Sequence, residues 1–380
     1  MPHASAAAVT RLKLTNFRNY PSLSLDLDGR PVVLTGPNGA GKTNLLEAVS
    51  FLAPGRGLRR AHLETVGRHG SDGTWAIAAT VRNGSGDVEL GTGIAPGAEG
   101  PEPRRSVRVN RAPARSTEAL AEHLSVVWLT PAMDGLFTGA AGERRHFLDR
   151  AVAAIDKAHG TRVNGFERAT RGRNKLLAEP NPNAAWLDAI ETEMAELGVA
   201  IAAARREWAA LIARLIEAGG RDSPFPWAEI QLEGTLEHAL DSHPASVAEA
   251  NYAAELAGDR PHDAAAGRTL AGPHRSDLRV RHGPKQMAAE TCSTGEQKAL
   301  LIGLVLAEAR LAAEQRGETP IVLLDEIAAH LDEVRREALF SVLENLGCQA
   351  FLTGTDAGVF APLEGRAERF LVRDASLSKA

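Results

Sequence analysis

The chain has 380 residues, of which 44% are hydrophobic and 24% are charged, and its formal net charge is −5. This length favours two or three domains, and the composition excludes wholesale disorder. Only two cysteines are present, which excludes a disulfide scaffold, and no apolar run approaches the ~20 residues that a membrane span needs. We therefore expect a cytoplasmic protein that has no contact with a membrane.

Charge is distributed unevenly along the chain. Residues 184–263 contain fifteen acidic and five basic residues, whereas residues 104–115 contain five arginines and no acid. Residues 143–175 contain nine basic and four acidic residues. Any contact with a polyanion must therefore come from a local basic surface, because the net charge of the whole chain is negative.

The first elements are strands that lead into a glycine-rich turn and a helix. Alternating residues over 11–17 and 23–27 predict half-buried strands. Residues 31–35 are mostly apolar, which is typical of a strand buried on both faces, and residues 44–52 have helical spacing. Between residues 74 and 115, strand-like pieces alternate with Gly/Pro-rich turns, which predicts an antiparallel sheet.

The middle of the chain is helical, and the β/α pattern returns after residue 272. The long apolar stripe over 186–217 predicts a helix whose tryptophan and methionine side chains lie in the core. In the middle of the chain we expect helices over 143–159, 161–177, 186–217 and 247–256. After residue 272 we expect helices over 296–313 and 333–346 and strands over 321–324 and 349–353.

A phosphate-binding motif follows the strand at 31–35. It fits G-x-x-x-x-G-K-[ST] directly after a strand and at the start of a helix, and its residues are Gly36, Pro37, Asn38, Gly39, Ala40, Gly41, Lys42 and Thr43. Glycines let backbone N–H groups surround phosphate oxygens, and the helix N-terminus favours negative charge. Lys42 is expected to reach the phosphates of ATP and Thr43 to ligate Mg²⁺. An ordinary strand-to-helix turn would need neither side chain.

Two acids end the apolar strand at 321–324. Asp325 is expected to hold Mg²⁺ near the phosphates, and Glu326 to polarise the attacking water as general base. Strands that end in acids are common, so the assignment depends on the pairing with the phosphate-binding motif. Lys42, Asp325 and Glu326 are the candidate catalytic residues.

The helix that precedes this strand opens with Ser293-Thr-Gly-Glu-Gln-Lys. The segment resembles the signature of ABC-type ATPases, in which Ser293 and Gly295 would contact ATP held by the opposite subunit. The other interpretation is a plain capping box, because Ser293 and Glu296 also fit S-x-x-E. Residues 328–332 resemble the D-loop of the same class, which assigns Asp332 to the ATP site in trans. Thr353-Gly-Thr355 stands where many of these ATPases have a switch histidine.

From end to end, the chain resembles the RecF family of bacterial recombination mediators. The resemblance rests on residues 12–20, the phosphate-binding motif, residues 131–134 and 139–149, residues 173–177 and 272–278, the signature, the acidic strand and the D-loop. The block Arg144-Arg145-x-Phe147-Leu-Asp149 and the segment Gly272-Pro-His-Arg are the most specific parts. The sequence departs from the family pattern at Thr294, Glu296 and Ser276.

This resemblance implies an α/β fold, in which an ABC/SMC-type P-loop ATPase head carries an inserted, mostly α-helical arm. The head would comprise residues 1–118 and 268–380, and the arm residues 119–267. It also implies dimerisation on ATP and weak DNA-stimulated ATP hydrolysis that acts as a switch. The expected ligands are single-stranded DNA, double-stranded DNA and gap junctions. The expected partners are RecR and RecO and, indirectly, RecA, which would be loaded at gaps for repair, replication restart and SOS induction.

The basic clusters leave alternatives open. The candidate DNA contacts are Arg104, Arg105, Arg108, Arg111, Arg144 and Arg145. The first four could equally belong to a solvated loop. For the last two, a DNA-facing surface is slightly favoured over a role as ion-pair partners. His274 and Arg275 are either catalytic or shape the arm, and the second role is favoured. Nothing in the sequence points to a zinc site.

Two other functions fit parts of the pattern. The first is the ATPase subunit of an ABC-type transporter, but the 254 residues between Gly41 and Gly295 exceed the spacing of a compact cassette. The second is a structural SMC-like clamp, but the helix over 186–217 is too short for a long coiled coil.

Overall fold

The computed structural model describes residues 5–95, 105–218, 223–328 and 331–380. The chain divides into two compact units. The first comprises Met1–Asp134, Asp222–Phe225 and Leu301–Ala380, and the second Gly135–Arg221 and Pro226–Leu300. The boundaries at 118/119 and 267/268 that the family resemblance implies remain a prediction.

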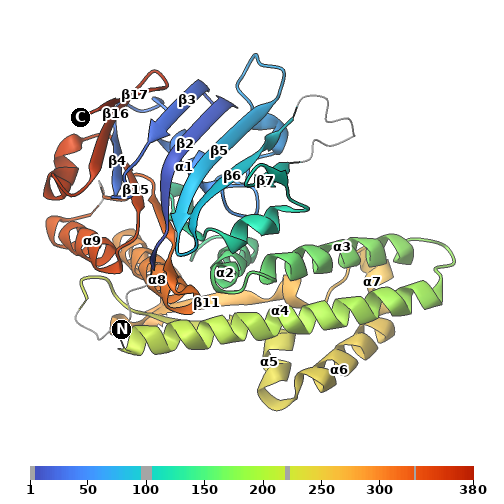
Figure 1. Ribbon diagram of the computed structural model, residues 1–380. Coiled ribbons are helices and arrows are strands. Elements are labelled where there is room, and N and C mark those ends of the chain that lie inside the picture. Colours follow the sequence, from blue (N-terminus) through green and yellow to red (C-terminus); the bar gives the residue numbers. More distant parts are fainter. Residues whose placement is uncertain (1–4, 96–104, 219–222, 329–330) are drawn as a thin grey trace. The chain divides into compact units, whose positions relative to one another are not determined.

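Two six-stranded sheets form the first unit within the described residues (Figure 1). One has the order β17-β16-β4-β15-β14-β9, and all of its pairs except β16–β17 are parallel. Its strands are β4 (Val32–Thr35), β9 (Val126–Leu129), β14 (Ile321–Leu324), β15 (Ala350–Gly354), β16 (Glu368–Arg373) and β17 (Ser376–Lys379). Every residue of β4, β9, β14 and β15 is buried, as the apolar runs predict for parallel strands covered on both faces.

The second sheet is antiparallel throughout and has the order β3-β2-β5-β6-β7-β8. Its strands are β2 (Ala8–Phe17), β3 (Tyr20–Asp26), β5 (Trp75–Asn83), β6 (Gly86–Ile94), β7 (Ser106–Val109) and β8 (Ala112–Pro113). The alternation of buried and exposed residues along β2 confirms the half-buried strand predicted over 11–17. The antiparallel pairing of β5, β6 and β7 confirms the sheet predicted between residues 74 and 115. A short parallel pair joins β1 (Ser5–Ala6) to β13 (Glu318–Thr319).

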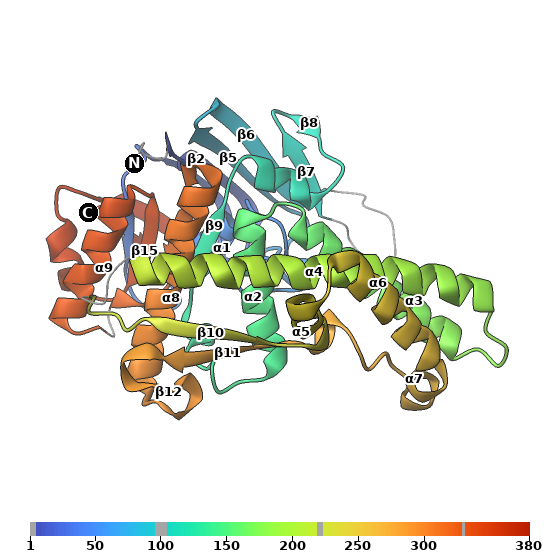
Figure 2. The same ribbon diagram turned by 90° about the horizontal axis from the view of Figure 1, so that it is seen from below.

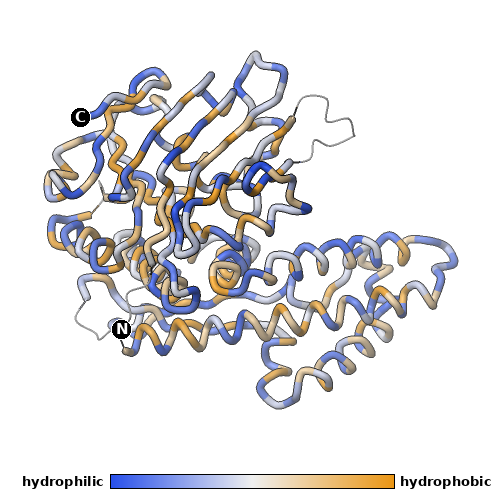
Figure 3. The backbone as a smooth tube through the Cα atoms, in the orientation of Figure 1, coloured by the Kyte–Doolittle hydropathy of each residue, from blue (hydrophilic) through white to orange (hydrophobic). Residues whose placement is uncertain are grey.

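The two sheets and helix α1 (Lys42–Ser50) share one hydrophobic core. Leu45, Leu46 and Val49 of α1 are fully buried in it. At the end of α1, Phe51 packs against Phe17 and Trp75, with ring centroids 5.2–6.0 Å apart. Figure 3 shows this apolar character as orange segments along the strands. Helix α9 (Glu333–Leu346) and the C-terminal part of α8 (Thr294–Arg316) complete the first unit.

The second unit is built on an antiparallel pair of helices, α3 (His159–Leu177) and α4 (Ala184–Ala218), which run side by side in both ribbon views (Figures 1 and 2). The other helices are α2 (Ala141–Ile155), α5 (Thr235–Ser242), α6 (Ala245–Gly258) and α7 (Arg260–Ala266). Met194 and Trp208 lie in the core as predicted, but the same prediction was wrong for Trp186, whose side chain is 66% exposed. Trp186 stands in the first turn of α4, before the buried stripe begins at Leu187.

A small antiparallel sheet in the second unit was not predicted. It joins β10 (Ala228–Glu233), β11 (Asp277–His282) and β12 (Met287–Ala288), so strands far apart in the sequence pair with each other. The long predicted elements agree with the structure to within a few residues, and β14 and α9 agree at both ends.

Candidate functional site

Backbone geometry explains the glycines of the phosphate-binding loop. The loop joins β4, in the middle of the parallel sheet, to α1. Gly36 has φ 144°, and a Cβ atom there would lie 2.2 Å from the carbonyl oxygen of Val372. Gly36 therefore allows the strand end to pass β16 without a clash.

Lys42 is buried under the loop, with 4% of its surface exposed. Its ammonium group donates to the carbonyl oxygens of Gly36 at 2.8 Å and Pro37 at 2.9 Å. Burial lowers the pKa of Lys42, and the charges of Glu326 and Asp325 partly oppose that shift. The lysine is thus held at the loop by neutral oxygens, which an incoming phosphate can replace.

The acidic strand meets the phosphate-binding motif as the sequence predicts. Because β14 and β15 are parallel neighbours of β4, their carboxyl ends lie at the same edge of the sheet. Asp325 Oδ1 accepts hydrogen bonds from the hydroxyl groups of Thr43 at 2.9 Å and Thr353 at 2.8 Å. The two hydroxyls hold the carboxylate in one orientation beside the loop.

Glu326 follows directly, in a left-handed backbone conformation with φ 56°. Its backbone N–H donates to the hydroxyl of Thr353 at 2.9 Å, and its side chain is half-buried. A non-glycine residue with positive φ is costly and is often found at functional sites. Thr353 is therefore bonded to both acids. The sequence pointed to this position only as the place of a missing histidine.

Two further residues at the loop were missed. Asn19 and Tyr20, at the tip of the β2–β3 hairpin, donate to the carbonyl oxygens of Ala40 and Gly41. The sequence signal was present, since both belong to the segment 12–20 that carries the family resemblance.

The signature segment belongs to the second unit, where it opens α8. Ser293, Thr294 and Gly295 are exposed. The carboxylate of Glu296 reaches back to the backbone N–H of Ser293 at 3.0 Å. A hydrogen-bonded ion pair with Lys285 and the bonds from Ser293 lower the pKa of Glu296 to about 2. One half of a capping box is therefore formed, and it leaves the small residues at the helix start facing solvent.

Asp332 is the N-cap of α9 and accepts from the backbone N–H of Arg335 at 2.8 Å. Its side chain is 57% exposed. Residues 329 and 330 of the predicted D-loop lie outside the described residues.

The candidate DNA contacts differ in how their guanidinium groups are used. Arg105 donates to the carbonyl oxygens of Gly55 and Phe51 and lies 5.0 Å from the Phe51 ring centroid, and burial lowers its pKa to about 10. Arg144 is buried and pairs with Asp277 through two hydrogen bonds of 2.7 Å. Both arginines therefore form bonds inside the chain.

The other four candidates are placed differently. Arg145 is half-buried and donates to the carbonyl oxygen of Ser276 at 2.8 Å. Arg108 is exposed, and Arg111 forms an exposed ion pair with Glu89. Arg104 lies outside the described residues.

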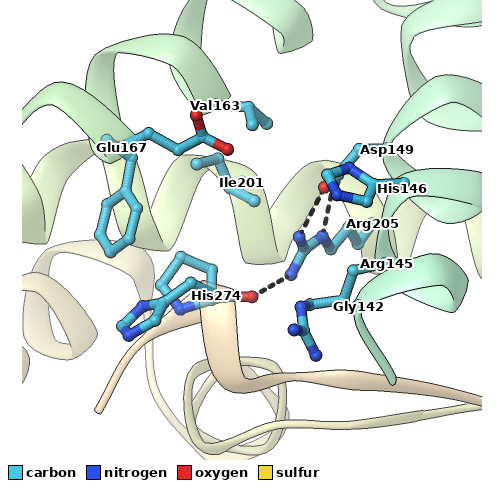
Figure 4. Close-up of a pocket in the computed structure, with 11 residues that line it drawn as sticks. Gly142, Arg145, His146, Asp149, Val163, Glu167, Ile201, Arg205 and His274 are labelled. Carbon is cyan, nitrogen blue, oxygen red and sulfur yellow. Dashed lines mark hydrogen bonds and ion pairs between the residues drawn. The ribbon is translucent and has the colours of Figure 1, made fainter. Parts of the chain in front are cut away.

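Residues from both of the most specific parts of the resemblance line a cavity of about 160 Å³ in the second unit (Figure 4); they are Arg145, Asp149, Pro273 and His274. Arg205 of α4 donates to both carboxylate oxygens of Asp149 at 2.9 Å and to the carbonyl oxygen of Pro273 at 2.7 Å. Asp149 also bonds the buried His159 at 2.8 Å. Burial alone would raise the pKa of Asp149, but His159 and Arg205 outweigh it and lower the pKa to about 2.

This ion-pair cluster ties α2, α3, α4 and the segment at 272–276 together. His274 belongs to the same lining, and its Nε2 bonds the carbonyl oxygen of Thr269 at 3.0 Å. The contacts support the expectation that this segment shapes the second unit.

The sequence of this chain is similar to those of known proteins. The model of the RecF/RecN/SMC N terminal domain family matches residues 8–370. A DNA replication and repair protein RecF from Mesorhizobium japonicum is 59% identical over 96% of both chains. Another, from Rhizobium etli, is 56% identical over 98% of this chain and 99% of its own. The chain belongs to the RecF family.

Solved structures with the same fold are known. A structure of the recombination mediator protein RecF-ATPrS in the RecFOR pathway matches 100% of both chains, with a TM-score of 0.87 and 21% identity. A Smc head domain from Pyrococcus furiosus matches 98% of this chain and 96% of its own, with a TM-score of 0.53 and 15% identity. The fold is that of an α/β ATPase head of the SMC type. Across the described residues, no helix is long and apolar enough to cross a membrane.

Proposed function

We propose that this RecF-family protein is an ATP-switched DNA-binding protein of recombinational repair. ATP binding would join two copies on DNA, and slow hydrolysis would release them. The observation that carries the proposal is the hydrogen-bonded group beside the phosphate-binding loop, which consists of Thr43, Asp325, Thr353 and Glu326. Ser293 and Gly295 of the signature, in contrast, are exposed to solvent. The names of the relatives support a role in DNA replication and repair, and a transporter subunit is not favoured.

Residues of the loop would bind the nucleotide. The backbone N–H groups of residues 39–43 surround the phosphates, and Lys42 exchanges the carbonyl oxygens of Gly36 and Pro37 for phosphate oxygens. Two solved structures that this chain resembles are named RecF-ATPrS and RecF-ATP, which supports ATP as the ligand.

The neighbouring hydroxyl and carboxylate fit Mg²⁺. Hard oxygen ligands suit this ion, and Thr43 Oγ1 and Asp325 Oδ1 lie 2.9 Å apart. When bound, the ion would neutralise charge on the phosphate oxygens. Thr353 keeps the Asp325 carboxylate turned toward Thr43, and Glu326 accepts a proton from the attacking water.

The second copy would complete the site. Ser293 and Gly295 stand exposed at the start of a 23-residue helix, whose first N–H groups favour an anion. A Cβ atom at Gly295 would meet nothing within 4 Å, so this surface is open to a nucleotide held by another subunit. Asp332 is assigned to the same contact.

Among the candidate arginines, the exposed ones are the preferred DNA contacts. The Arg111–Glu89 pair is solvent-exposed, so it contributes little and a DNA phosphate can replace Glu89. Arg108 is exposed on β7, and Arg145 is half-buried. For Arg105 and Arg144, a DNA contact would require their internal bonds to break. Arg104 remains a candidate from the sequence alone. RecR and RecO are the proposed partners, with RecA loading at gaps as the outcome.

Sedimentation of the protein with and without ATP, on gapped and on fully duplex DNA, tests this proposal. We expect a dimer only with ATP, and binding to gapped DNA that also requires ATP. A monomer under all conditions, or DNA binding that is indifferent to ATP, would contradict it.

A further inference from the structure

The tip of the β2–β3 hairpin has an unusual backbone. Phe17 pairs with Tyr20, so Arg18 and Asn19 alone form the loop. Arg18 has φ 53°, a conformation that favours glycine at the first position of such a loop. Arginine is held there because its guanidinium forms two hydrogen bonds, of 2.8 and 2.6 Å, with the fully buried Glu47 of α1. The tip is thus fixed against the helix that carries Lys42.

Fixed in this way, the tip reaches the carbonyl side of the phosphate-binding loop. The amide of Asn19 donates to the carbonyl oxygen of Ala40 at 3.2 Å, and the hydroxyl of Tyr20 donates to that of Gly41 at 3.1 Å. Asn44 of α1 in turn donates to Asn19 at 2.7 Å. Tyr20 is fully buried. Its hydroxyl therefore has no solvent to replace the bond to Gly41.

These two bonds control N–H groups on the opposite side of the loop. A trans peptide is planar, so the C=O of one residue and the N–H of the next point in opposite directions. Holding the carbonyl of Ala40 therefore aims the N–H of Gly41, and holding the carbonyl of Gly41 aims the N–H of Lys42. Both N–H groups are directed away from the hairpin tip.

Gly41 shows how close this approach is. Its φ is 115°, and a Cβ atom there would lie 2.7 Å from Asn19 Nδ2 and 2.8 Å from Tyr20 Oη. Glycine is therefore required both by the backbone conformation and by the two side chains that touch the loop.

We propose that Asn19 and Tyr20 are positioning residues for nucleotide binding, which hold the phosphate-binding loop with the N–H groups of Gly41 and Lys42 aimed at the phosphates. The inference rests on the proposed ATP site. It assigns a role to the tip of the β2–β3 hairpin, whose side chains bond the phosphate-binding loop.

The expected effect is moderate, because each carbonyl has a second donor. Leu45 N–H donates to the carbonyl of Gly41 at 3.1 Å, and Ala375 N–H to that of Ala40 at 3.4 Å. Loss of one neutral hydrogen bond should therefore weaken nucleotide binding about threefold to tenfold. ATP and ADP should be affected alike, because both carry the phosphates nearest the loop.

The chain contains a matched control. Its two tyrosines, Tyr20 and Tyr252, are both buried and both donate to a backbone carbonyl; the acceptor of Tyr252 is Ala271, at 2.9 Å in the second unit. The full-length variants Tyr20→Phe and Tyr252→Phe each lose one such bond. Asn19→Ala, at a half-buried position, provides a second test that removes no aromatic packing.

The experiment measures the Kd of ATP and ADP by fluorescence titration, the melting temperature, and the hydrolysis rate at saturating ATP. Tyr20→Phe and Asn19→Ala should weaken both nucleotides about threefold to tenfold and leave the saturated rate near that of the wild type. Tyr252→Phe should lower the melting temperature but bind nucleotide normally.

Wild-type affinity in both Tyr20→Phe and Asn19→Ala would overturn the inference, and so would equal weakening in Tyr252→Phe. A wild-type protein that binds no ATP would instead contradict the proposed function together with the inference. The two failures are therefore distinguishable.

Discussion

Replacement of Thr353 by valine tests whether one hydroxyl organises both acids of the site. Valine keeps the shape of the side chain but removes the donor to Asp325, at 2.8 Å, and the acceptor for the N–H of Glu326, at 2.9 Å. A hydrogen bond to a charged group contributes about 1.5–3 kcal/mol, and a neutral one about 1 kcal/mol. Asp325 keeps its bond to Thr43. Loss of the other two bonds should therefore lower the free energy of unfolding by about 2.5–4 kcal/mol.

The same change should slow hydrolysis more than it weakens ATP binding. Lys42 and Thr43 remain to hold the nucleotide, but Glu326 loses the contact that fixes its strained backbone. If about 1.4–2.8 kcal/mol of this loss appears in the transition state, the rate falls about tenfold to a hundredfold.

Urea unfolding and single-turnover hydrolysis measure the two effects separately. Thr353→Ser keeps the hydroxyl and serves as the control. Hydrolysis at the wild-type rate in Thr353→Val would refute the argument that the threonine positions these acids.

Three further predictions concern separate parts of the chain. Glu326→Gln should bind ATP but hydrolyse it roughly 10²–10⁴-fold more slowly, so that the ATP-bound dimer accumulates; near-normal turnover would assign the base elsewhere. Arg173→Met should lower the free energy of unfolding, measured in urea, by about 3–5 kcal/mol. The reason is that the fully buried Arg173 pairs with Asp263 at 2.6 Å and with Glu191 at 2.9 Å, and the substitution removes both ion pairs. A loss under about 1 kcal/mol would contradict this role. The pKa of Asp149, lowered to about 2, lies below its ordinary value, so its contribution to stability is complete above about pH 4 and is lost as the pH falls towards 2. Asp149→Asn should remove that part of the acid-unfolding profile, and an unchanged slope between pH 4 and 2 would show that another group titrates there.

Local sequence patterns predicted the elements that carry the nucleotide site. The apolar runs of β4 and β14 and the glycine-rich loop are local signals, and parallel pairing then brings Thr43 to Asp325 across 282 positions. Because this pairing is general to P-loop ATPases, the phosphate-binding motif and the acidic strand were enough to predict that Thr43 and Asp325 lie together.

Supporting contacts were harder to predict, since they depend on tertiary approach. Nothing local indicates that Tyr20 meets Gly41, or that Thr353 bonds both acids. The arginine cluster at 104–115 illustrates the same limit. Arg105 and Arg111 look equivalent in sequence, yet the guanidinium of Arg105 is buried against carbonyl oxygens of the segment that follows α1, and that of Arg111 is exposed. Strands β10 and β11 were missed because they pair across more than 40 residues of sequence.

The central claim is that ATP is held between two copies of the chain, and mixing two inactive variants tests it most directly. Lys42→Ala loses the charge that binds phosphate, whereas Ser293→Arg places a bulky cation where the exposed Ser293 would approach the nucleotide of the other subunit. A mixed dimer has one intact site, formed by the loop of the Ser293→Arg subunit and the signature of the Lys42→Ala subunit. We predict that each variant alone lacks DNA-stimulated hydrolysis and that mixing them restores part of it. Wild-type hydrolysis by Ser293→Arg alone, or no activity on mixing, would contradict a shared site.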